Sequence, residues 1–251
     1  MGSAGSRRRA AIGAAGAAAA AALLPALSEV RIGPAARRLT ERWRQVPVEP
    51  RGTAQLGISF RPLQAEALGL DPEDALRTLL GYPFGLIRLA AYWDRLEPGP
   101  GQFQPDELDR QLDAAEKAGK QVIICVGAVK AFGYPEYFVP AHRLDRPLPE
   151  GTLITPDGQE RLLAAATEYL TKVVQRYAGR ESVICWQVEH EAVDPLGLEH
   201  SWRLAEAFVR AEVAAVRAAD PTRPVMLNGF LPTSAPVALM QWWRTRDQGD
   251  S

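Results

Sequence analysis

From residue 56 onward, the hydrophobic residues of the chain follow two spacings in turn. Short continuous apolar runs, typical of buried strands, occupy 56–60, 85–90, 121–126, 183–188 and 224–227. Stretches with apolar residues about 3.6 positions apart predict helices over 72–80, 105–118, 156–177 and 201–219, and a further helix over 234–243. Because parallel neighbours need a crossover connection, this strand and helix alternation predicts an α/β protein with a parallel sheet.

The connections between these elements differ in length at the two ends of the predicted sheet. The segments that leave the strands are long and rich in polar and aromatic residues, as at 92–104, 130–155 and 189–200. The segments that return from the helices are short, as at 119–120 and 179–182. This asymmetry is typical of a (β/α)8 TIM-type barrel with its site on the C-terminal face. We therefore predict a partial barrel of about five β/α units.

The N-terminal residues predict a targeting segment. Arg7, Arg8 and Arg9 precede an uncharged, alanine-dominated stretch over 10–27, which is the order of a signal peptide or membrane anchor. A disordered leader or an over-extended start is the alternative, because alanine is weakly apolar and Pro25 interrupts the run. We predict a signal or anchor at 1–27, a lead-in at 28–55 and a barrel domain at 56–251. The protein is then extracellular or anchored on the outer face, or cytoplasmic if 1–27 is not a signal.

Composition narrows the functional classes. The chain has 251 residues, 47% of them hydrophobic, and a formal net charge of −1, which fits a globular protein and gives no basic tail for nucleic acid. Cys125 and Cys185 each lie in an apolar strand-like run, so we predict buried free thiols. The sequence indicates no cofactor and no metal, and it does not predict an oligomeric state.

Polar and aromatic side chains gather where the predicted strands end. These rim positions include Arg88, Trp93, Glu97, Tyr134, Gln187 and Asn228. Sugars need such a mixture, because polar groups hold the hydroxyls and flat rings stack on the apolar face of the sugar. We therefore predict a carbohydrate substrate.

The hexapeptide over 186–191, WQVEHE, carries the strongest chemical signal. If the strand alternates beyond Gln187, then Gln187, Glu189 and Glu191 point the same way, and crowded carboxylates tend to raise at least one pKa. A carboxyl group kept neutral can protonate a leaving oxygen. A solvated acidic loop is the plain alternative. A zinc protease motif beginning at His190 is discounted, because the position four residues later is Asp194 and Pro195 excludes the helix that the motif needs. Metal-assisted hydrolysis through Glu189, His190 and Asp194 ranks last.

Two segments resemble barrel glycoside hydrolases of the family 42 β-galactosidase and family 5 cellulase kind. IRLAAYWDRLEPGPGQF over 87–103 is similar to their second-strand signature, and WQVEHE is similar to the WQVDNE motif of family 42. The resemblance implies that Glu191 is the acid/base and that Arg88 supports the active-site carboxylates. It makes Trp93, Glu97 and Tyr134 candidate subsite residues, beside Trp186, Gln187, Glu189, His190 and Asn228. His190 stands where the family has an asparagine that bonds the sugar 2-hydroxyl.

The same resemblance implies a second carboxylate that the chain does not supply. A retaining glycosidase needs a second carboxylate as nucleophile, and these families place it after the seventh strand. A whole barrel takes roughly 250 residues, which is longer than the barrel domain predicted at 56–251. We therefore expect the N-terminal portion of a retaining β-glycosidase that acts on a β-linked oligo- or polysaccharide. The alternative is a non-catalytic carbohydrate-binding or cell-surface scaffold. Metal-assisted hydrolysis is a third hypothesis.

Overall fold

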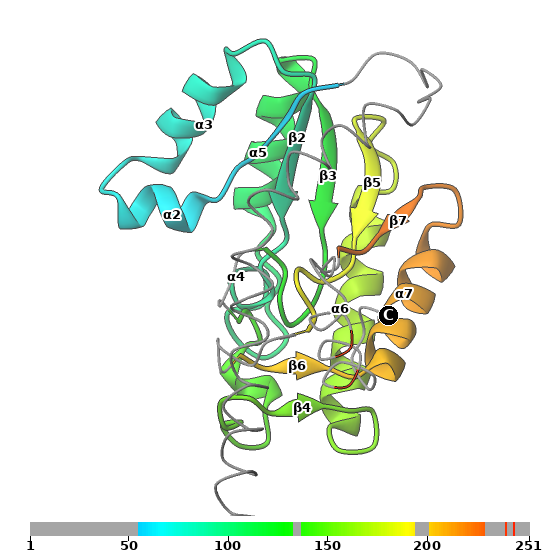
Figure 1. Cartoon of the computed structure of the whole chain (residues 1–251). Coiled ribbons are helices and arrows are strands. Elements are labelled where there is room, and N and C mark those ends of the chain that lie inside the picture. Colours follow the sequence, from blue (N-terminus) through cyan, green and yellow to red (C-terminus); the bar gives the residue numbers. More distant parts are fainter. Residues whose placement is uncertain (1–54, 133–136, 194–200, 229–238, 240–242, 244–251) are drawn as a thin grey trace, which may run out of the picture. The chain divides into compact units, whose positions relative to one another are not determined.

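A computed structural model (Figure 1) describes residues 55–132, 137–193 and 201–228, together with Leu239 and Trp243. The predicted signal or anchor at 1–27, the lead-in up to residue 54, Tyr134 and most of the helix predicted over 234–243 lie outside the described residues. The chain divides into two compact units, and the described residues of the smaller unit, Leu239 and Trp243, are both exposed. The larger unit contains the sheet and is the one described below.

The predicted strands form one sheet whose strands are all parallel. They are β1 (Gly57–Ser59), β2 (Leu86–Ala90), β3 (Gln121–Cys125), β5 (Val183–Gln187) and β7 (Val225–Met226), in the spatial order β1-β2-β3-β5-β7. The order follows the sequence without a reversal, as in consecutive units of a (β/α) barrel. The predicted α/β class is therefore confirmed, and the five described strands are those of a partial barrel.

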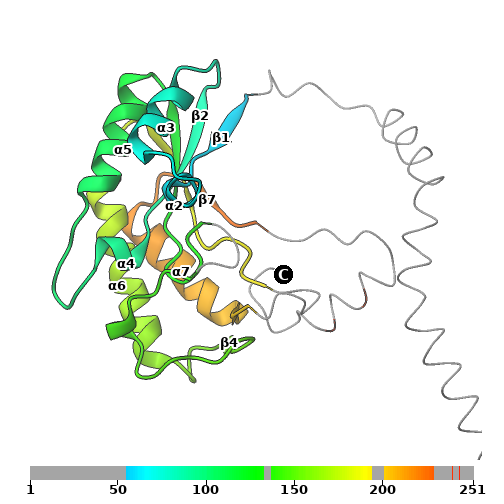
Figure 2. The same ribbon diagram turned by 90° about the vertical axis from the view of Figure 1, so that its left-hand side faces the viewer.

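Four helices lie along one face of this sheet (Figure 2). They are α3 (Pro72–Leu80), α5 (Asp106–Lys117), α6 (Glu160–Tyr177) and α7 (Glu206–Ala219). Helix α3 begins where the sequence predicts, because Pro72 suits a first helical position and the Asp71 carboxylate accepts a 2.8 Å hydrogen bond from the Asp74 N–H. None of the described helices is long and apolar enough to span a membrane.

Several short elements interrupt the long connections. They are α2 (Pro62–Ala67), α4 (Trp93–Leu96), a 3₁₀ turn η1 (Ala141–Arg143), β4 (Leu153–Ile154) and β6 (Arg203–Leu204). Strands β4 and β6 pair in parallel as a second, two-stranded sheet. The predicted start of a helix at residue 201 is therefore wrong: residues 203–204 form β6, and α7 begins at Glu206.

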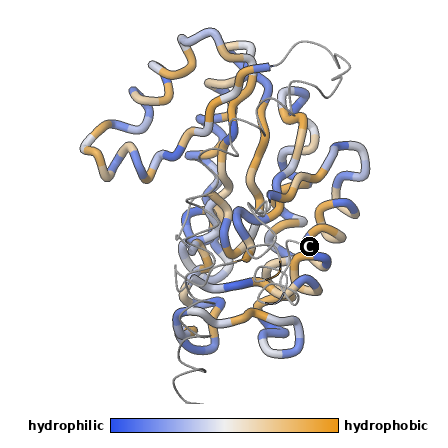
Figure 3. Tube along the Cα trace, in the orientation of Figure 1, coloured by the Kyte–Doolittle hydropathy of each residue, from blue (hydrophilic) through white to orange (hydrophobic). Residues whose placement is uncertain are grey.

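The main hydrophobic core lies between the sheet and the helices. Ile87, Leu89, Val122, Ile124 and Trp186 alternate along the strands and are all completely buried. The hydropathy colouring shows hydrophobic residues concentrated along β3 and β5 (Figure 3). Cys125 and Cys185 are buried and free, as predicted. The other side of the sheet carries a second, smaller hydrophobic cluster that includes Ala90, Cys125 and Phe132, beside polar groups such as Arg88 and Gln187.

Candidate active site

The strand register brings the predicted rim residues of β2 and β5 onto one face of the sheet. Arg88 pairs with Ser59 and Ile123, while Gln187 pairs with Cys125, which in turn pairs with Ala90. Side chains two positions apart on a strand share a face, and partners in register face the same side. Arg88 and Gln187 therefore belong to the face opposite the helices.

Arg88 and Gln187 are joined directly. The Arg88 Nη1 donates to Gln187 Oε1 over 2.9 Å, and its Nε donates to the Ser59 hydroxyl over 3.0 Å. The guanidinium also lies 4.4 Å from the centre of the Phe132 ring, a cation–π distance. Gln187 is completely buried, and its amide nitrogen donates to the Glu189 carbonyl over 3.0 Å and to Asn228 Oδ1 over 3.3 Å. These hydrogen bonds connect the C-terminal ends of β1, β2 and β5 and hold Gln187 in place at the start of the rim.

The backbone beyond β5 does not continue the strand. Glu189 and Glu191 have φ values of 53° and 55°, the left-handed region that side chains other than glycine rarely adopt. Such strain costs about 1–3 kcal/mol per residue and gathers at functional sites. The prediction that Gln187, Glu189 and Glu191 point the same way assumed strand alternation, and this segment does not have it.

Glu189 is a buried structural carboxylate, only 1% exposed. It accepts backbone hydrogen bonds from Val129 over 2.9 Å and from Lys130 over 2.6 Å. Its approach to the connection after β3 requires a glycine, because a Cβ on Gly127 would lie 2.3 Å from the Glu189 nitrogen. Glu189 therefore locks the rim of β5 onto the rim of β3.

A second buried carboxyl group, Glu212 of α7, stands against Glu189. Burial, then repulsion from the Glu189 carboxylate, raises the pKa of Glu212 well above its ordinary value. Glu212 therefore keeps its proton at neutral pH, while the Ala128 N–H approaches its Oε1 at 3.4 Å. The raised pKa expected from crowded carboxylates is found here, in a residue that the sequence analysis missed.

Glu191 differs from Glu189 in exposure and in how it is held. Its side chain is 29% exposed, and His190 Nε2 lies 3.9 Å from its Oε1. The backbone is clamped at both ends: its N–H donates to Asn228 Oδ1 over 3.1 Å, and its carbonyl accepts from Lys130 Nζ over 2.8 Å. The predicted site residues Asn228 and Glu191 are thus in contact, and the Glu191 carboxylate lies at the open rim.

His190 is neutral at ordinary pH. Burial, reinforced by the positive charges of Arg88, Arg61 and Lys130, lowers the pKa of His190 to about 4. The Gln187 amide nitrogen, which can only donate, approaches His190 Nδ1 at 3.5 Å. Nδ1 therefore accepts, and the ring hydrogen lies on Nε2, the atom that faces Glu191.

Trp93 and Glu97 form a closed cluster after β2. Trp93 is completely buried, stacks on Tyr169 with 5.0 Å between ring centres, and donates to Glu97 Oε2 over 2.9 Å. The other oxygen of Glu97 accepts from Arg143 over 2.6 Å and lies 2.8 Å from His142 Nε2. Burial raises the pKa of Glu97, but the hydrogen bonds from Arg143, Trp93 and His142 outweigh it and lower that pKa. As placed here, these residues join the β2 rim to η1 and offer no open face to a sugar.

Trp186 also lies in the core. It is completely buried, and its Nε1 donates to Asp220 Oδ2 over 2.9 Å. Because Trp186 pairs in register with Ile124, it faces the helices, whereas Gln187 faces the other side. The predicted contact between Trp186 and substrate does not fit this placement.

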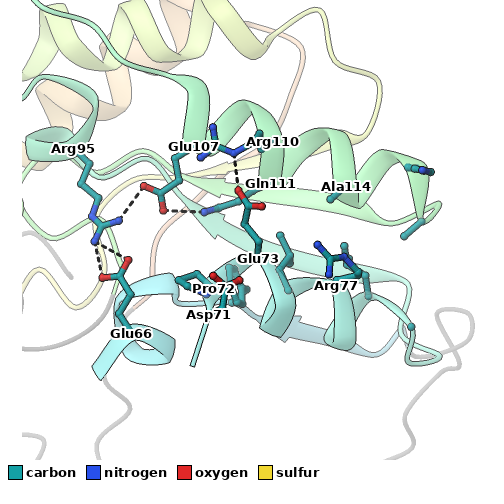
Figure 4. A pocket seen from close by; sticks show the side chains of 16 residues that line it. Glu66, Asp71, Pro72, Glu73, Arg77, Arg95, Glu107, Arg110, Gln111 and Ala114 are labelled. Carbon is teal, nitrogen blue, oxygen red and sulfur yellow. Dashed lines mark hydrogen bonds and ion pairs between the residues drawn. The ribbon is translucent and has the colours of Figure 1, made fainter. Parts of the chain in front are cut away.

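A large cavity of about 770 Å³ lies elsewhere, between α3 and α5 (Figure 4). Ion pairs cross it: Arg95 bonds Glu66 and Glu107 at 2.9 and 3.0 Å, and Arg110 bonds Glu73 at 2.9 Å. Among the residues that the structure describes, its lining includes none of the predicted site residues. This cavity is therefore distinct from the predicted site at the strand ends.

Two buried charged residues of this rim, Glu212 and Lys130, were not among the predicted site residues, although the sequence holds a signal for each. Glu212 lies on the apolar face of α7 with Phe208, Val209 and Val216, and Lys130 follows the apolar run after β3. A charged residue on a buried face needs a partner, so each position indicates a buried polar contact. Among the described residues, no three His, Cys, Asp or Glu side chains gather as a metal site would require, and Asp194 lies outside them.

Several solved structures with a similar fold are carbohydrate-active enzymes. A family 5, subfamily 18 enzyme from Streptomyces cattleya in complex with GlcNAc superposes with a TM-score of 0.51 and 18% identity, over 70% of this chain and 44% of that one. The exo-beta-1,4-mannosidase from Opitutaceae bacterium strain TAV5 gives 0.50 and 17%, over 69% and 31%. Endo-glycoceramidase II from Rhodococcus sp. gives 0.50 and 15%, over 70% and 49%. The chain thus spans less than half the length of these three, and identities this low show the barrel fold alone.

Comparison with sequence families is more specific. No curated protein matches the chain. The family model for glycoside hydrolase family 42, described as beta-galactosidase, matches residues 84–211, just over half of the chain. The matched region runs from the residue pair before β2 into α7 and contains Arg88, Gln187 and the clamped Glu191. The chain therefore belongs to glycoside hydrolase family 42.

Proposed function

We propose that this chain carries the proton-donor half of a retaining glycoside hydrolase site that cleaves a β-linked oligo- or polysaccharide, with Glu191 as the acid/base. One observation carries the proposal: a partly exposed carboxylate stands at the C-terminal rim of the sheet on a left-handed backbone clamped by Asn228 and Lys130. Membership of family 42 and the resemblance of WQVEHE to the family motif support the same residue.

In this mechanism, Glu191 moves one proton in each of two steps. In the first, the carboxylic acid of Glu191 protonates the glycosidic oxygen while a second carboxylate attacks the anomeric carbon, so that the C–O bond to the leaving alcohol breaks. In the second, the Glu191 carboxylate takes a proton from water, which displaces the enzyme from the sugar and restores the acid. Glu189 does not fit as the second carboxylate, because it is buried and its oxygens accept two backbone N–H groups.

The neighbouring polar groups are suited to hold sugar hydroxyls. Neutral His190 presents an Nε2–H donor beside Glu191, at the position where the family motif has asparagine. An imidazole reaches farther than a carboxamide and keeps a single donor, so we propose that His190 sets the choice of sugar. The scaffold alternative relied on rim aromatic residues, and its case is weakened by the burial of Trp93 and Trp186.

The proposal is tested with Glu191→Gln in the full-length protein and a panel of 4-nitrophenyl β-glycosides. The amide keeps the shape of the side chain but cannot transfer a proton, so kcat should fall on the order of 10²- to 10⁴-fold. Glu181→Gln is the matched control, because Glu181 is exposed at the opposite end of the same strand. Undiminished hydrolysis by Glu191→Gln would remove Glu191 from the reaction.

A further inference from the structure

We propose that Lys130 is the positioning residue of this site: it holds the Glu189–Glu191 segment in the one backbone shape that presents the Glu191 carboxylate to substrate. The inference rests on the proposed function, because it concerns the orientation of the proton donor. Lys130 lies beyond the end of β3, is only 1% exposed and takes no part in the proton transfer itself.

Lys130 contacts three successive residues of the rim after β5. Its N–H donates to Glu189 Oε2 over 2.6 Å, its carbonyl accepts from the His190 N–H over 2.7 Å, and its Nζ donates to the Glu191 carbonyl over 2.8 Å. A single residue thus bonds the side chain of one neighbour and the main chain of the next two. The rim cannot change shape without breaking one of these bonds.

The ammonium contact controls the direction of the Glu191 side chain. Lys130 Nζ fixes the carbonyl of Glu191, and Asn228 Oδ1 fixes its N–H over 3.1 Å. Holding both peptide groups that flank a Cα holds φ and ψ, and these two angles determine where the Cα–Cβ bond points. Because the resulting φ of 55° is unfavourable, Glu191 would relax toward an ordinary conformation if one of the two holds were lost.

The chemistry of a buried ammonium explains why a lysine stands here. A charge taken out of water must find strong acceptors, and Lys130 Nζ bonds the buried Ser201 hydroxyl over 3.3 Å besides the Glu191 carbonyl. Its positive charge is also one of those that keep His190 neutral. Lys130 therefore fixes the geometry of Glu191, and it adds to burial, Arg88 and Arg61 in lowering the pKa of His190.

The test is Lys130→Met in the full-length protein, which keeps the length of the side chain and removes the donor. Phenyl β-glycosides need a protonated leaving group, whereas 2,4-dinitrophenyl β-glycosides do not. We expect kcat/KM, which reports the first step, to fall about 10- to 100-fold on the phenyl substrate and much less on the dinitrophenyl substrate. A loss of structure alone would lower both rates equally.

Lys120→Met is the matched control. Lys120 Nζ also donates to two main-chain carbonyls, those of Tyr82 and Phe84 at 2.9 and 2.7 Å, but at the opposite end of β3. We expect its ratio of phenyl to dinitrophenyl rates to equal that of the wild type. If Lys130→Met does not fold, Lys130→Gln, which keeps a shorter donor, takes its place in the same comparison.

Three results would overturn the inference: an unchanged ratio in Lys130→Met, an equal loss on both substrates, or failure of both Lys130 variants to fold, which would make Lys130 purely structural. Failure of the proposed function has a separate signature, because Glu191→Gln would then leave hydrolysis intact whatever Lys130 does.

Discussion

Glu97 and Glu191 each follow a strand of the same sheet, and each stands near an aromatic residue in a family-like motif, yet the structure treats their carboxylates differently. Glu97 is 7% exposed, and both of its oxygens have partners in Trp93, His142 and Arg143. Glu191 is held through its backbone, while its carboxylate lies at the rim with His190 Nε2 3.9 Å away. The Glu97 carboxylate is thus held at its oxygens, whereas Glu191, the proposed acid/base, is held by its main chain.

Replacing each of these two carboxylates by an amide gives the largest expected effects, on stability at Glu97 and on turnover at Glu191. Glu97→Gln weakens a buried set of charge-assisted hydrogen bonds and should lower the free energy of unfolding by about 2–3 kcal/mol. Glu191→Gln should leave the melting temperature within a few degrees of the wild type while turnover is lost. Thermal unfolding of both variants measures the stability change, and kcat on one aryl glycoside measures the change in turnover. The comparison breaks if Glu97→Gln is as stable as the wild type.

Gly127→Ala tests whether the β3 rim holds the β5 rim. The added Cβ would lie 2.3 Å from the Glu189 nitrogen, so we expect a loss of about 1–3 kcal/mol in unfolding free energy and a reduced kcat. Gly179→Ala is the control, because a Cβ at Gly179 meets nothing within 4 Å. Equal stability of the two variants would show that the two rims are not in close contact.

Glu212→Gln should stabilise the protein at neutral pH. The pKa of Glu212 is raised in the folded state, so the unfolded chain releases this proton first and stability falls as pH rises above about 4.5. A carboxamide is neutral at every pH, and we expect a melting temperature a few degrees higher at pH 7, with the gain shrinking toward pH 4. Glu181→Gln, an exposed change in charge, should show no such pH dependence. A destabilised Glu212→Gln at pH 7 would contradict a protonated Glu212.

His190 gives the smallest effect, with the opposite sign. Its pKa is lowered to about 4 in the folded state, so the unfolded chain binds a proton as pH falls through 6.5 while the folded chain does not. Its contribution to stability is complete above pH 6.5 and is lost between pH 6.5 and 4. Melting temperatures of the wild type and His190→Asn should therefore converge or cross over this window. Parallel curves would mean that His190 is not held neutral by its surroundings.

The sequence predicts the strands and helices of this molecule better than the side-chain directions at the C-terminal rim of the sheet. Apolar runs place all five strands to within about two residues, and Pro72 and Leu80 bound α3 as expected. These features depend on local spacing and propensity, which the sequence displays directly. The structure also brings five of the predicted site residues, Arg88, Gln187, His190, Glu191 and Asn228, into one connected group, and their roles stay predictions.

What escaped prediction depends on contacts between distant segments. The left-handed backbone at Glu189 and Glu191 is set by Gly127, Lys130 and Asn228, which come from two other rims. Tyr169 of α6 stacks on Trp93 and helps to bury it, and the sequence around residue 93 does not predict this contact. Local alternation therefore assigned the side-chain directions of this rim incorrectly.

The most direct test of the account is the leaving-group dependence of Glu191→Ala with added azide. We predict a fall in kcat/KM on the order of 10²- to 10⁴-fold for a phenyl β-glycoside and a far smaller fall in kcat/KM for the 2,4-dinitrophenyl β-glycoside, whose leaving group departs without a proton. Azide, which needs no general base, should then accelerate turnover and give the β-glycosyl azide. Equal losses on the two substrates, with no response to azide, would contradict Glu191 as the acid/base.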